Sequence, residues 1–492
     1  MKEIEFIGNK KYPTNDIGVS QLFIDMFNDE IVYCREQGWY IWNGKYWQLD
    51  SREGGIINEK IKIMARYCLN KLYENPNIAE EDITKQIKFW SKLSTKAYRD
   101  TIIRDSMSIC PVNSDVFNKH KFLFNCQNGT YDFKRKMFRD FDKSDYLTDI
   151  SNVVYDKNAD CPRFKQYLEE VMENKQDKID YLLKMAAYCL TGDTSRECFF
   201  VLYGEKTRNG KGTFVSTLNH LMGTYTNTIK SSSITKKTLN TGGSNATPDF
   251  AKLKYSRLVN VNEIEDGMML DIALIKQLTG GDVLTARALY KEEFEFTPQF
   301  KIVINTNFLP RMSEDSIFTS DRIHLISFDR HFEYTERDLD LKDKLKGEIS
   351  GIFNVLTIYW EKLKKEGFIV PKSSQDTIQQ YRYNSNNVLL FVKEQLYESP
   401  NTWETLSDVF KCYASWCEEG GYNQMAKKTF VERLTRCGAF IEDKQARHTN
   451  KKGVSVSARG WVKGFSIGPT SMEQYQIKTA DLTPIDEKNM PF

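Results

Sequence analysis

Four short, continuously apolar runs lie in the middle of the chain and alternate with stretches of helical periodicity. They cover residues 198–203, 257–262, 300–305 and 323–328. A strand that is buried on both faces has this pattern, and helices between such strands are typical of a parallel sheet. The pattern therefore predicts an α/β domain over residues 166–370, with a parallel sheet at its centre.

The region before this domain has the alternation of β-hairpins. Aromatic residues alternate around Asn-Gly pairs in residues 39–47 and 122–133. An Asn-Gly pair readily adopts the positive φ angles of a tight hairpin turn. Because helical periodicity separates the two hairpins, we expect residues 1–165 to form an α+β domain.

The region after the α/β domain divides into three parts. Residues 371–387 are polar and are expected to form a linker. Residues 388–467 combine three helical patterns with two short strand-like runs, and residues 468–492 follow as a tail.

Composition excludes several classes of protein. Hydrophobic residues make up 40% of the chain and charged residues 28%, and no run approaches the roughly 20 apolar residues that span a bilayer. The first residues lack a signal-peptide core, so we expect a cytoplasmic protein with no membrane partner. The ten cysteines form no CxxC pair and no zinc-spaced cluster, which fits reduced thiols.

A glycine-containing loop follows the first apolar run and precedes a helical pattern. Strand, loop and helix in this order are the context of a phosphate-binding Walker A loop. Glycines let backbone N–H groups surround phosphates, and Lys211 would bridge the β- and γ-phosphates of ATP. The candidate nucleotide-binding residues are Gly204, Arg208, Asn209, Gly210, Lys211, Gly212 and Thr213.

This loop departs from the common pattern in two respects. Five residues separate Gly204 from Gly210, where four are usual, and Gly212 replaces the usual Ser or Thr ligand of Mg²⁺. Thr213 is therefore the candidate hydroxyl ligand of the metal, and water is the alternative. A Gly/Lys-rich surface turn remains the alternative interpretation of the loop itself.

The next two apolar runs end in polar residues that suit ATP hydrolysis. Glu263 follows the second run and can orient the attacking water and help to hold Mg²⁺, with Glu265 and Asp266 as alternatives. Asn307 follows the third run and can contact the γ-phosphate, with Asn305 as the alternative.

Arg322 stands directly before the fourth run. An arginine there can neutralise charge on a phosphoryl group bound to a neighbouring subunit. An ordinary salt bridge to a surface acid is the other interpretation.

Together these motifs resemble the superfamily 3 helicases of the AAA+ class, in the branch of phage and plasmid primase–helicases and poxvirus-type proteins. The likeness covers about residues 100–370 and includes residues 276–287, 296–298, 307–311 and 322–328 besides the loop and Glu263. The resemblance implies a homohexameric ring that binds ATP and Mg²⁺ at its subunit interfaces. It also implies 3′-to-5′ unwinding, single-stranded and forked DNA as substrates, and catalytic roles for Lys211, Glu263, Asn307 and Arg322.

The resemblance further implies a hairpin between the Glu263 strand and the Asn307 strand that grips single-stranded DNA. It would lie within residues 286–294, with Lys291 at its tip and Arg287 as the alternative. Tyr290 beside the tip would suit base stacking. One departure concerns Asn262, which stands where some relatives carry a second acid.

Basic residues are concentrated near the carboxyl end. Residues 427–463 contain ten basic residues and three acids, a net charge of +7 against +2 for the whole chain. Local positive charge is typical of a nucleic-acid contact, although a solvated face is the alternative. The pattern predicts a winged helix for origin double-stranded DNA, with Lys427 and Lys428 in the major groove and a wing of Arg447, Lys451 and Lys452.

The sequence therefore predicts an ATP-dependent replicative DNA helicase of a phage or mobile genetic element, which could load itself at an origin. No paired-carboxylate site precedes the motor domain, so we expect no primer synthesis. Two alternatives stay open. One is an origin-binding ATPase switch without processive unwinding, and the other is a P-loop nucleotide kinase.

Overall fold

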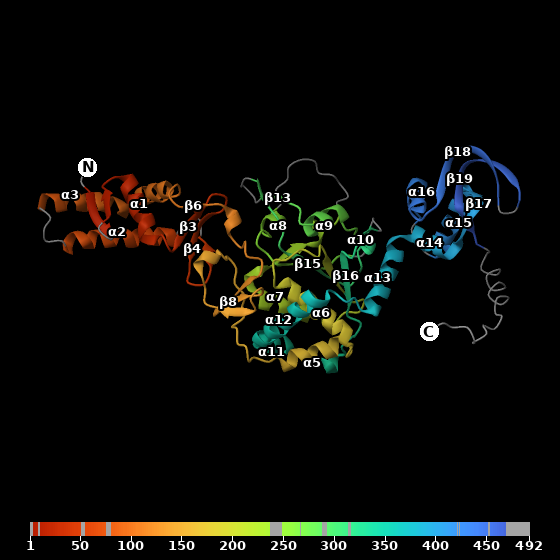
Figure 1. Cartoon of the computed structure of the whole chain (residues 1–492), viewed down its shortest axis with the longest axis horizontal. Coiled ribbons are helices and arrows are strands. Elements are labelled where there is room, and N and C mark those ends of the chain that lie inside the picture. Colours follow the sequence, from red (N-terminus) through yellow and green to blue (C-terminus); the bar gives the residue numbers. More distant parts are fainter. Residues whose placement is uncertain are drawn as a thin grey trace. The chain divides into compact units, whose positions relative to one another are not determined.

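The computed structural model describes residues 3–7, 10–50, 55–74, 80–236, 248–265, 267–287, 293–312, 316–420, 422, 424–450 and 453–468. The chain divides into two compact units (Figure 1). The first comprises residues 1–310 and 319–375, and the second comprises residues 311–318 and 376–492. Among the described residues, no helix combines the length and apolarity needed to cross a membrane.

A five-stranded parallel sheet forms the centre of the first unit, as the apolar runs predicted. The strand order is β11-β12-β15-β10-β16. The bounds are Phe199–Tyr203 for β10, Thr226–Lys230 for β11, Leu258–Asn262 for β12, Lys301–Thr306 for β15 and Ile323–Ser327 for β16. Because β15 lies between β10 and β12, the polar residues at the carboxyl ends of these three strands meet at one edge of the sheet.

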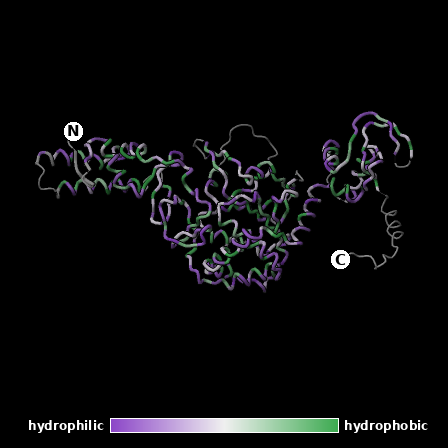
Figure 2. The backbone as a smooth tube through the Cα atoms, viewed as in Figure 1, coloured by the Kyte–Doolittle hydropathy of each residue, from purple (hydrophilic) through white to green (hydrophobic). Residues whose placement is uncertain are grey.

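Helices connect and cover this sheet. They are α5 (Pro162–Val171), α6 (Gln176–Cys189), α7 (Lys211–Met222), α8 (Pro248–Ala251), α9 (Ile272–Thr279), α11 (Leu341–Gly347) and α12 (Ile349–Glu366). Nearly all residues of β10, β12, β15 and β16 are buried. Figure 2 colours the backbone by hydropathy and shows hydrophobic and hydrophilic positions interspersed along this unit. Strands covered by helices on the sheet faces lose their exposure to water, which is why the four runs are apolar rather than alternating.

In the part of the chain before α5 that the structure describes, there are three small sheets and four α-helices. Strands β1 (Glu3–Ile7) and β2 (Lys10–Pro13) form the first sheet. The second sheet has the order β5-β4-β3-β6 and contains β3 (Ile31–Cys34), β4 (Gly38–Trp42), β5 (Trp47–Leu49) and β6 (Pro111–Val112). The helices are α1 (Asp16–Phe27), α2 (Ile56–Glu74), α3 (Glu80–Trp90) and α4 (Lys96–Ser106). The third sheet contains β7 (Leu123–Cys126), β8 (Gly129–Asp132) and β9 (Met137–Arg139). Both hairpins predicted around Asn-Gly pairs are present, as β4–β5 and β7–β8.

The boundary between the hydrophobic cores lies near residue 118, before the domain boundary expected at residue 165. Phe124 and Phe133 pack with Phe353 and Trp360 of α12, in the same core as the central sheet. Separate clusters hold together the residues before about 118. The β7–β8 hairpin therefore belongs to the core of the α/β domain, because its aromatic side chains are part of that core.

The second unit places three helices against a three-stranded antiparallel sheet. The chain order is α14 (Asn387–Gln395), β17 (Leu396–Thr405), α15 (Leu406–Glu419), α16 (Lys427–Arg436), β18 (Phe440–Thr449) and β19 (Ser455–Ile467), and the sheet order is β17-β19-β18. Phe391, Tyr413 and Phe430 from the three helices contact one another in its core. The three predicted helical patterns and the two terminal strands are present, together with β17.

The segment expected to be a linker, residues 371–387, is helical, because α13 spans Lys372–Ser385. Ser374, Ile378 and Tyr381 are buried at the spacing of one helix face. The Tyr381 ring also contacts Phe318, which lies in the short helix α10 (Ser316–Thr319). The polar composition of this segment concealed a narrow buried stripe.

Candidate nucleotide site

The predicted Walker A loop lies between β10 and α7, at the carboxyl edge of the central sheet. Gly210 has a φ of +89°, and a Cβ on it would approach Val171 Cγ1 to 2.5 Å. A Cβ on Gly204 would lie 2.1 Å from Asn209 Nδ2. Glycine is therefore required at both positions, one for backbone conformation and close packing and the other for space.

Neighbouring elements hold the loop in place. The Tyr167 hydroxyl donates to the Gly210 carbonyl over 2.8 Å, and the Phe332 N–H donates to the Arg208 carbonyl over 3.0 Å. Asn209 is buried, and its amide donates to the Lys206 carbonyl over 2.6 Å. The loop is thus tied to α5 and to the segment after β16, which favours a preformed site.

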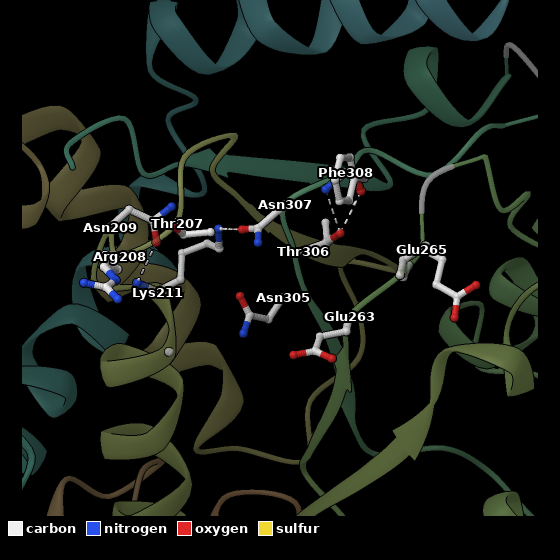
Figure 3. A pocket seen from close by; sticks show the side chains of 12 residues that line it. Thr207, Arg208, Asn209, Lys211, Glu263, Glu265, Asn305, Thr306, Asn307 and Phe308 are labelled. Atoms are coloured by element: carbon white, nitrogen blue, oxygen red, sulfur yellow. Dashed lines mark hydrogen bonds between the residues drawn. The ribbon is translucent and has the colours of Figure 1, made fainter. Parts of the chain in front are cut away.

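Lys211 is buried at the start of α7, and its ammonium points to the end of β15 (Figure 3). Its Nζ donates to Asn307 Oδ1 over 2.7 Å and to the Gly204 carbonyl over 3.0 Å. Burial lowers the pKa of this ammonium to about 8. Both acceptors are neutral, so a phosphate would supply the anion that this cation lacks.

A cavity of about 410 Å³ opens beside Lys211 at the ends of β12 and β15. Its lining includes Arg208, Asn209, Lys211, Gly212, Glu263, Glu265, Asn305 and Asn307. The structure therefore brings the loop, the candidate acid and both candidate sensor amides to one space. Sequence order alone did not reveal that β15, and with it Asn307, lies between the other two strands.

Glu263 is the acid whose carboxylate faces this space. Figure 3 shows it on the same side as the Asn305 amide, whereas the Glu265 carboxylate is directed away from Lys211. Glu263 has a φ of +52°, and its N–H donates to the Asn305 carbonyl over 3.1 Å. A left-handed backbone is unfavourable for glutamate and commonly marks a functional position. Asp266, the other alternative acid, lies outside the described residues.

The residues around this cavity are compatible with ATP. They are also compatible with Mg²⁺ when phosphate oxygens of the nucleotide complete its ligands. The described residues contain no cluster of three acidic, His or Cys side chains that could hold a metal alone. Mg²⁺ is usually bound by one or two carboxylates together with substrate phosphates and water, and Glu263 is placed to supply one carboxylate. Gly212 leaves room at the usual hydroxyl position, because no atom apart from its chain neighbours and the backbone of its own helix lies within 4 Å of a Cβ built there.

Thr213, the candidate metal ligand, is not among the residues that line this cavity. It lines a second cavity of about 370 Å³ on the other side of the loop, together with Arg208, Gly210, Phe332 and Leu341. The helical turn between Gly212 and Thr213 directs consecutive side chains to different faces. This second cavity is more apolar than the first and lies directly beside Gly210.

Arg322 lies at the amino ends of the strands, whereas the loop lies at their carboxyl ends. Its guanidinium forms an ion pair with Glu197 and donates to Thr279 Oγ1 over 3.2 Å. Phe199, the first residue of β10, pairs with Ile323, whereas the loop follows Tyr203 at the other end. Arg322 is therefore separated from the nucleotide cavity of its own chain by the length of the strands.

The hairpin predicted between the Glu263 and Asn307 strands is present. Strand β13 (Leu284–Arg287) pairs antiparallel with β14 (Glu293–Phe296). Arg287 ends β13 and is half-buried, whereas Tyr290 and Lys291 lie outside the described residues. In the second unit, Lys427, Lys428 and Arg447 are exposed on α16 and β18. Lys451 and Lys452 also lie outside the described residues.

Three family models match consecutive parts of the chain. A "D5 N terminal like" model matches residues 20–173, a family of unknown function (DUF5906) matches residues 202–322, and a "Poxvirus D5 protein-like" model matches residues 383–459. The two D5 matches enclose the region that contains the nucleotide cavity.

Curated viral proteins are similar to this chain. A protein of Acanthamoeba polyphaga mimivirus, named "Putative helicase", is 28% identical over 68% of this chain and 37% of its own length. Another "Putative helicase", from Invertebrate iridescent virus 3, is 21% identical over 88% of this chain and 53% of its own length. "Primase D5" of fowlpox virus is 24% identical over 68% of this chain and 40% of its own length. The chain thus spans about a third to a half of the length of these relatives.

Among solved structures, the apo C-terminal region of NrS-1 aligns with 92% of this chain and all of its own chain, at 10% identity and a TM-score of 0.49.

Proposed function

We propose that this chain is an ATP-dependent replicative DNA helicase of a virus, phage or related mobile element, because D5-type family models match two parts of it and viral proteins named helicase or primase are similar to it. One observation carries the ATP dependence. The Lys211 ammonium, the Asn307 amide and the Glu263 carboxylate surround one cavity at the ends of three adjacent strands. DNA is the partner that the helicase and primase relatives imply.

In the proposed reaction, the chain's own groups bind the triphosphate and direct a water molecule. Lys211 and the N–H groups after Gly210 bind the β- and γ-phosphates, and Glu263 accepts a hydrogen bond from the water that attacks the γ-phosphorus. Asn307 contacts the γ-phosphate and orients it relative to that water. Mg²⁺, when bound, neutralises charge on the phosphate oxygens. The apolar cavity beside Gly210 is the proposed binding place of the adenine base.

We further propose that subunits assemble into a homohexameric ring and move 3′-to-5′ along one strand of forked DNA. The location of Arg322 supports assembly, since it is too far from the nucleotide cavity of its own chain to act there. The β13–β14 hairpin, with Arg287, Tyr290 and Lys291, would contact the single strand in the ring. The resemblance to superfamily 3 helicases supports the polarity and the ring.

For the second unit we propose a winged-helix fold that binds origin double-stranded DNA. The order helix, strand, helix, helix, strand, strand and the three-stranded sheet support this assignment. Lys427 and Lys428 would enter the major groove from α16. An ATPase that switches at an origin without processive unwinding is the second candidate, because such a protein would use the same two sites.

The direct test replaces the phosphate-binding lysine. Lys211→Ala should reduce ATP hydrolysis by about a hundredfold or more, because the buried cation contacts the transferred phosphate. Steady-state ATPase and unwinding of a labelled fork are measured together, with Lys206→Ala, an exposed loop lysine, as the control. Turnover retained by Lys211→Ala would contradict the site. Normal DNA-stimulated ATPase without strand separation in the unchanged chain would favour the switch.

A further inference from the structure

A second charged concave surface, here named the basic cavity, lies at the β7–β8–β9 sheet. Its volume is about 420 Å³, and it is lined by the loop before β7, the first residues of that strand and the turn between β8 and β9. The residues that matter for its chemistry are Lys119, Lys121, Phe122, Lys134, Asp132 and Asp145. The nucleotide cavity shares none of these residues.

Both acids in the basic cavity already have positive partners. Asp145 accepts two hydrogen bonds from Arg139 Nη2, over 2.6 and 2.8 Å. Asp132 accepts from the backbone N–H groups of Lys134 and Arg135, over 2.8 and 3.0 Å, and Arg135 Nε lies 3.8 Å from its other oxygen. These acids therefore compensate the arginines and leave the lysines unmatched.

Lys119, Lys121 and Lys134 make no ion pair with any residue in the described parts of the chain. The Lys134 ammonium instead lies 4.9 Å from the centre of the Phe122 ring. Phe122 is half-buried and gives the cavity an apolar wall. Three lysines that line one concave surface repel one another, and an anion bound there would reduce that repulsion.

The basic cavity is also connected to the motor sheet. The Gly192 N–H, between α6 and β10, donates to the Lys121 carbonyl over 2.7 Å. Arg257, fully buried directly before β12, donates to the carbonyls of Leu123 and Leu190. These contacts lie at the amino ends of the strands, whereas nucleotide residues lie at the carboxyl ends. A ligand in the basic cavity would thus bind residues that are joined to the motor sheet at the ends of the strands away from ATP.

We propose that the basic cavity binds the phosphodiester backbone of single-stranded DNA. A cavity of this volume admits a phosphate with its sugar or base, and an aromatic wall beside lysines is typical of single-strand binding. A duplex presents a wide convex surface and would reach only the rim. The site is separate from the β13–β14 hairpin, and the inference rests on the proposed use of DNA as a substrate.

The test compares two charge-matched variants of the full chain. Lys119→Glu/Lys134→Glu changes two exposed residues of the basic cavity, and Lys96→Glu/Lys157→Glu changes two exposed lysines elsewhere before α5. Binding of a labelled oligothymidylate is followed by fluorescence anisotropy without nucleotide, over a series of salt concentrations. The cavity variant should bind at least about tenfold more weakly, with a salt slope shallower by about 1.4, because each single-strand phosphate contact contributes about 0.7. ATPase activity without DNA should be unchanged in both variants.

Other outcomes would separate this inference from the proposed function. Equal oligothymidylate binding by the cavity variant and the control would overturn the inference and leave the helicase proposal intact. A loss confined to duplex DNA would overturn the single-strand assignment. An unchanged chain that binds no DNA in any form would contradict the proposed function and this inference together. Photo-crosslinking of iodouracil-containing DNA should independently label the peptide that contains Phe122, and labelling absent from that peptide would count against the site.

Discussion

Burial determines what Lys211 can bind. Its ammonium contacts only the Gly204 carbonyl and the Asn307 amide, and it has no carboxylate partner among the described residues. A buried cation with neutral partners is unfavourable, as its lowered pKa reflects. A triphosphate in the adjacent cavity would offset that cost, so we expect nucleotide binding to stabilise the loop and the first turn of α7.

The missing hydroxyl at Gly212 leads to a gain-of-function prediction. No atom outside its chain neighbours and its own helix backbone lies within 4 Å of a Cβ built on Gly212, so Gly212→Thr should be accommodated and should supply the usual Mg²⁺ ligand. The Mg²⁺ concentration for half-maximal ATPase should fall severalfold, as measured by metal titration. Gly210→Ala is the contrasting control and should lose activity, because its Cβ would approach Val171 within 2.5 Å. An unchanged metal requirement in Gly212→Thr would indicate that the nucleotide and water suffice.

A buried histidine gives the molecule an acid sensitivity. His324 in β16 accepts or donates a hydrogen bond with the Tyr181 hydroxyl, and burial lowers its pKa from 6.5 to about 4. The unfolded chain therefore binds more protons between these values, and stability falls as pH decreases from 6.5 towards 4. The loss between pH 7 and pH 5 should be about 2 kcal/mol.

Urea unfolding of the intact chain and of His324→Gln at both pH values measures this loss. The Gln variant retains a polar partner for Tyr181 but does not titrate. Between pH 7 and pH 5, its free energy of unfolding should therefore fall by about 2 kcal/mol less than that of the unchanged chain. Equal acid sensitivity in the two proteins would assign the effect to other groups.

Among the elements, strands with strong apolar signals could be predicted and polar ones could not. Four central strands were evident because both faces are buried. Strand β11 lies at the sheet edge, and only Ile229 of its five residues is buried, so it gives no apolar run. Helix α13 was interpreted as a linker because Ser374, Ile378 and Tyr381 form a stripe too narrow to dominate its polar composition.

The candidate site was predictable residue by residue, but its assembly was not. Strand, loop and helix signals located Lys211, Glu263 and Asn307 in the sequence. Their convergence depends on β15 inserting between β10 and β12, which no local pattern encodes. The ion pair between Arg322 and Glu197 fits the salt-bridge alternative, but its partner could not be identified because the two residues are far apart in the sequence.

Helix α16 carries a prediction about duplex DNA. Phe430 and Leu434 face the core of the second unit, whereas Lys427, Lys428 and Arg436 are exposed. Lys427→Glu/Lys428→Glu should weaken duplex binding about tenfold or more without unfolding the unit, since neither side chain is buried. The matched control is Lys393→Glu/Lys411→Glu, on exposed positions of α14 and α15. Gel-shift assays with both variants test the winged-helix proposal, which equal binding would contradict.

For the whole molecule, the position of Arg322 bears on assembly. Strand β10, from Phe199 to Tyr203, runs from the end of the sheet that holds Arg322 to the end that holds the loop. Its length of about 16 Å separates the two. Its present partners are Glu197 and Thr279. If it acts on ATP, it must do so on a neighbouring subunit's nucleotide, and it must then exchange the Glu197 carboxylate for a phosphate.

This requirement predicts complementation between two inactive proteins. Lys211→Ala lacks the phosphate-binding lysine, and Arg322→Ala lacks the arginine, so each alone should hydrolyse little ATP. In an equal mixture, about a quarter of random interfaces combine an intact Lys211 on one subunit with an intact Arg322 on the next. The mixture should therefore recover about a quarter of the normal ATPase rate, measured after subunit exchange at low protein concentration. Glu197→Ala is the control for a purely structural ion pair and should retain activity. No recovery in the mixture, together with equal losses in Glu197→Ala and Arg322→Ala, would mean that Arg322 stabilises its own subunit and does not reach the next one.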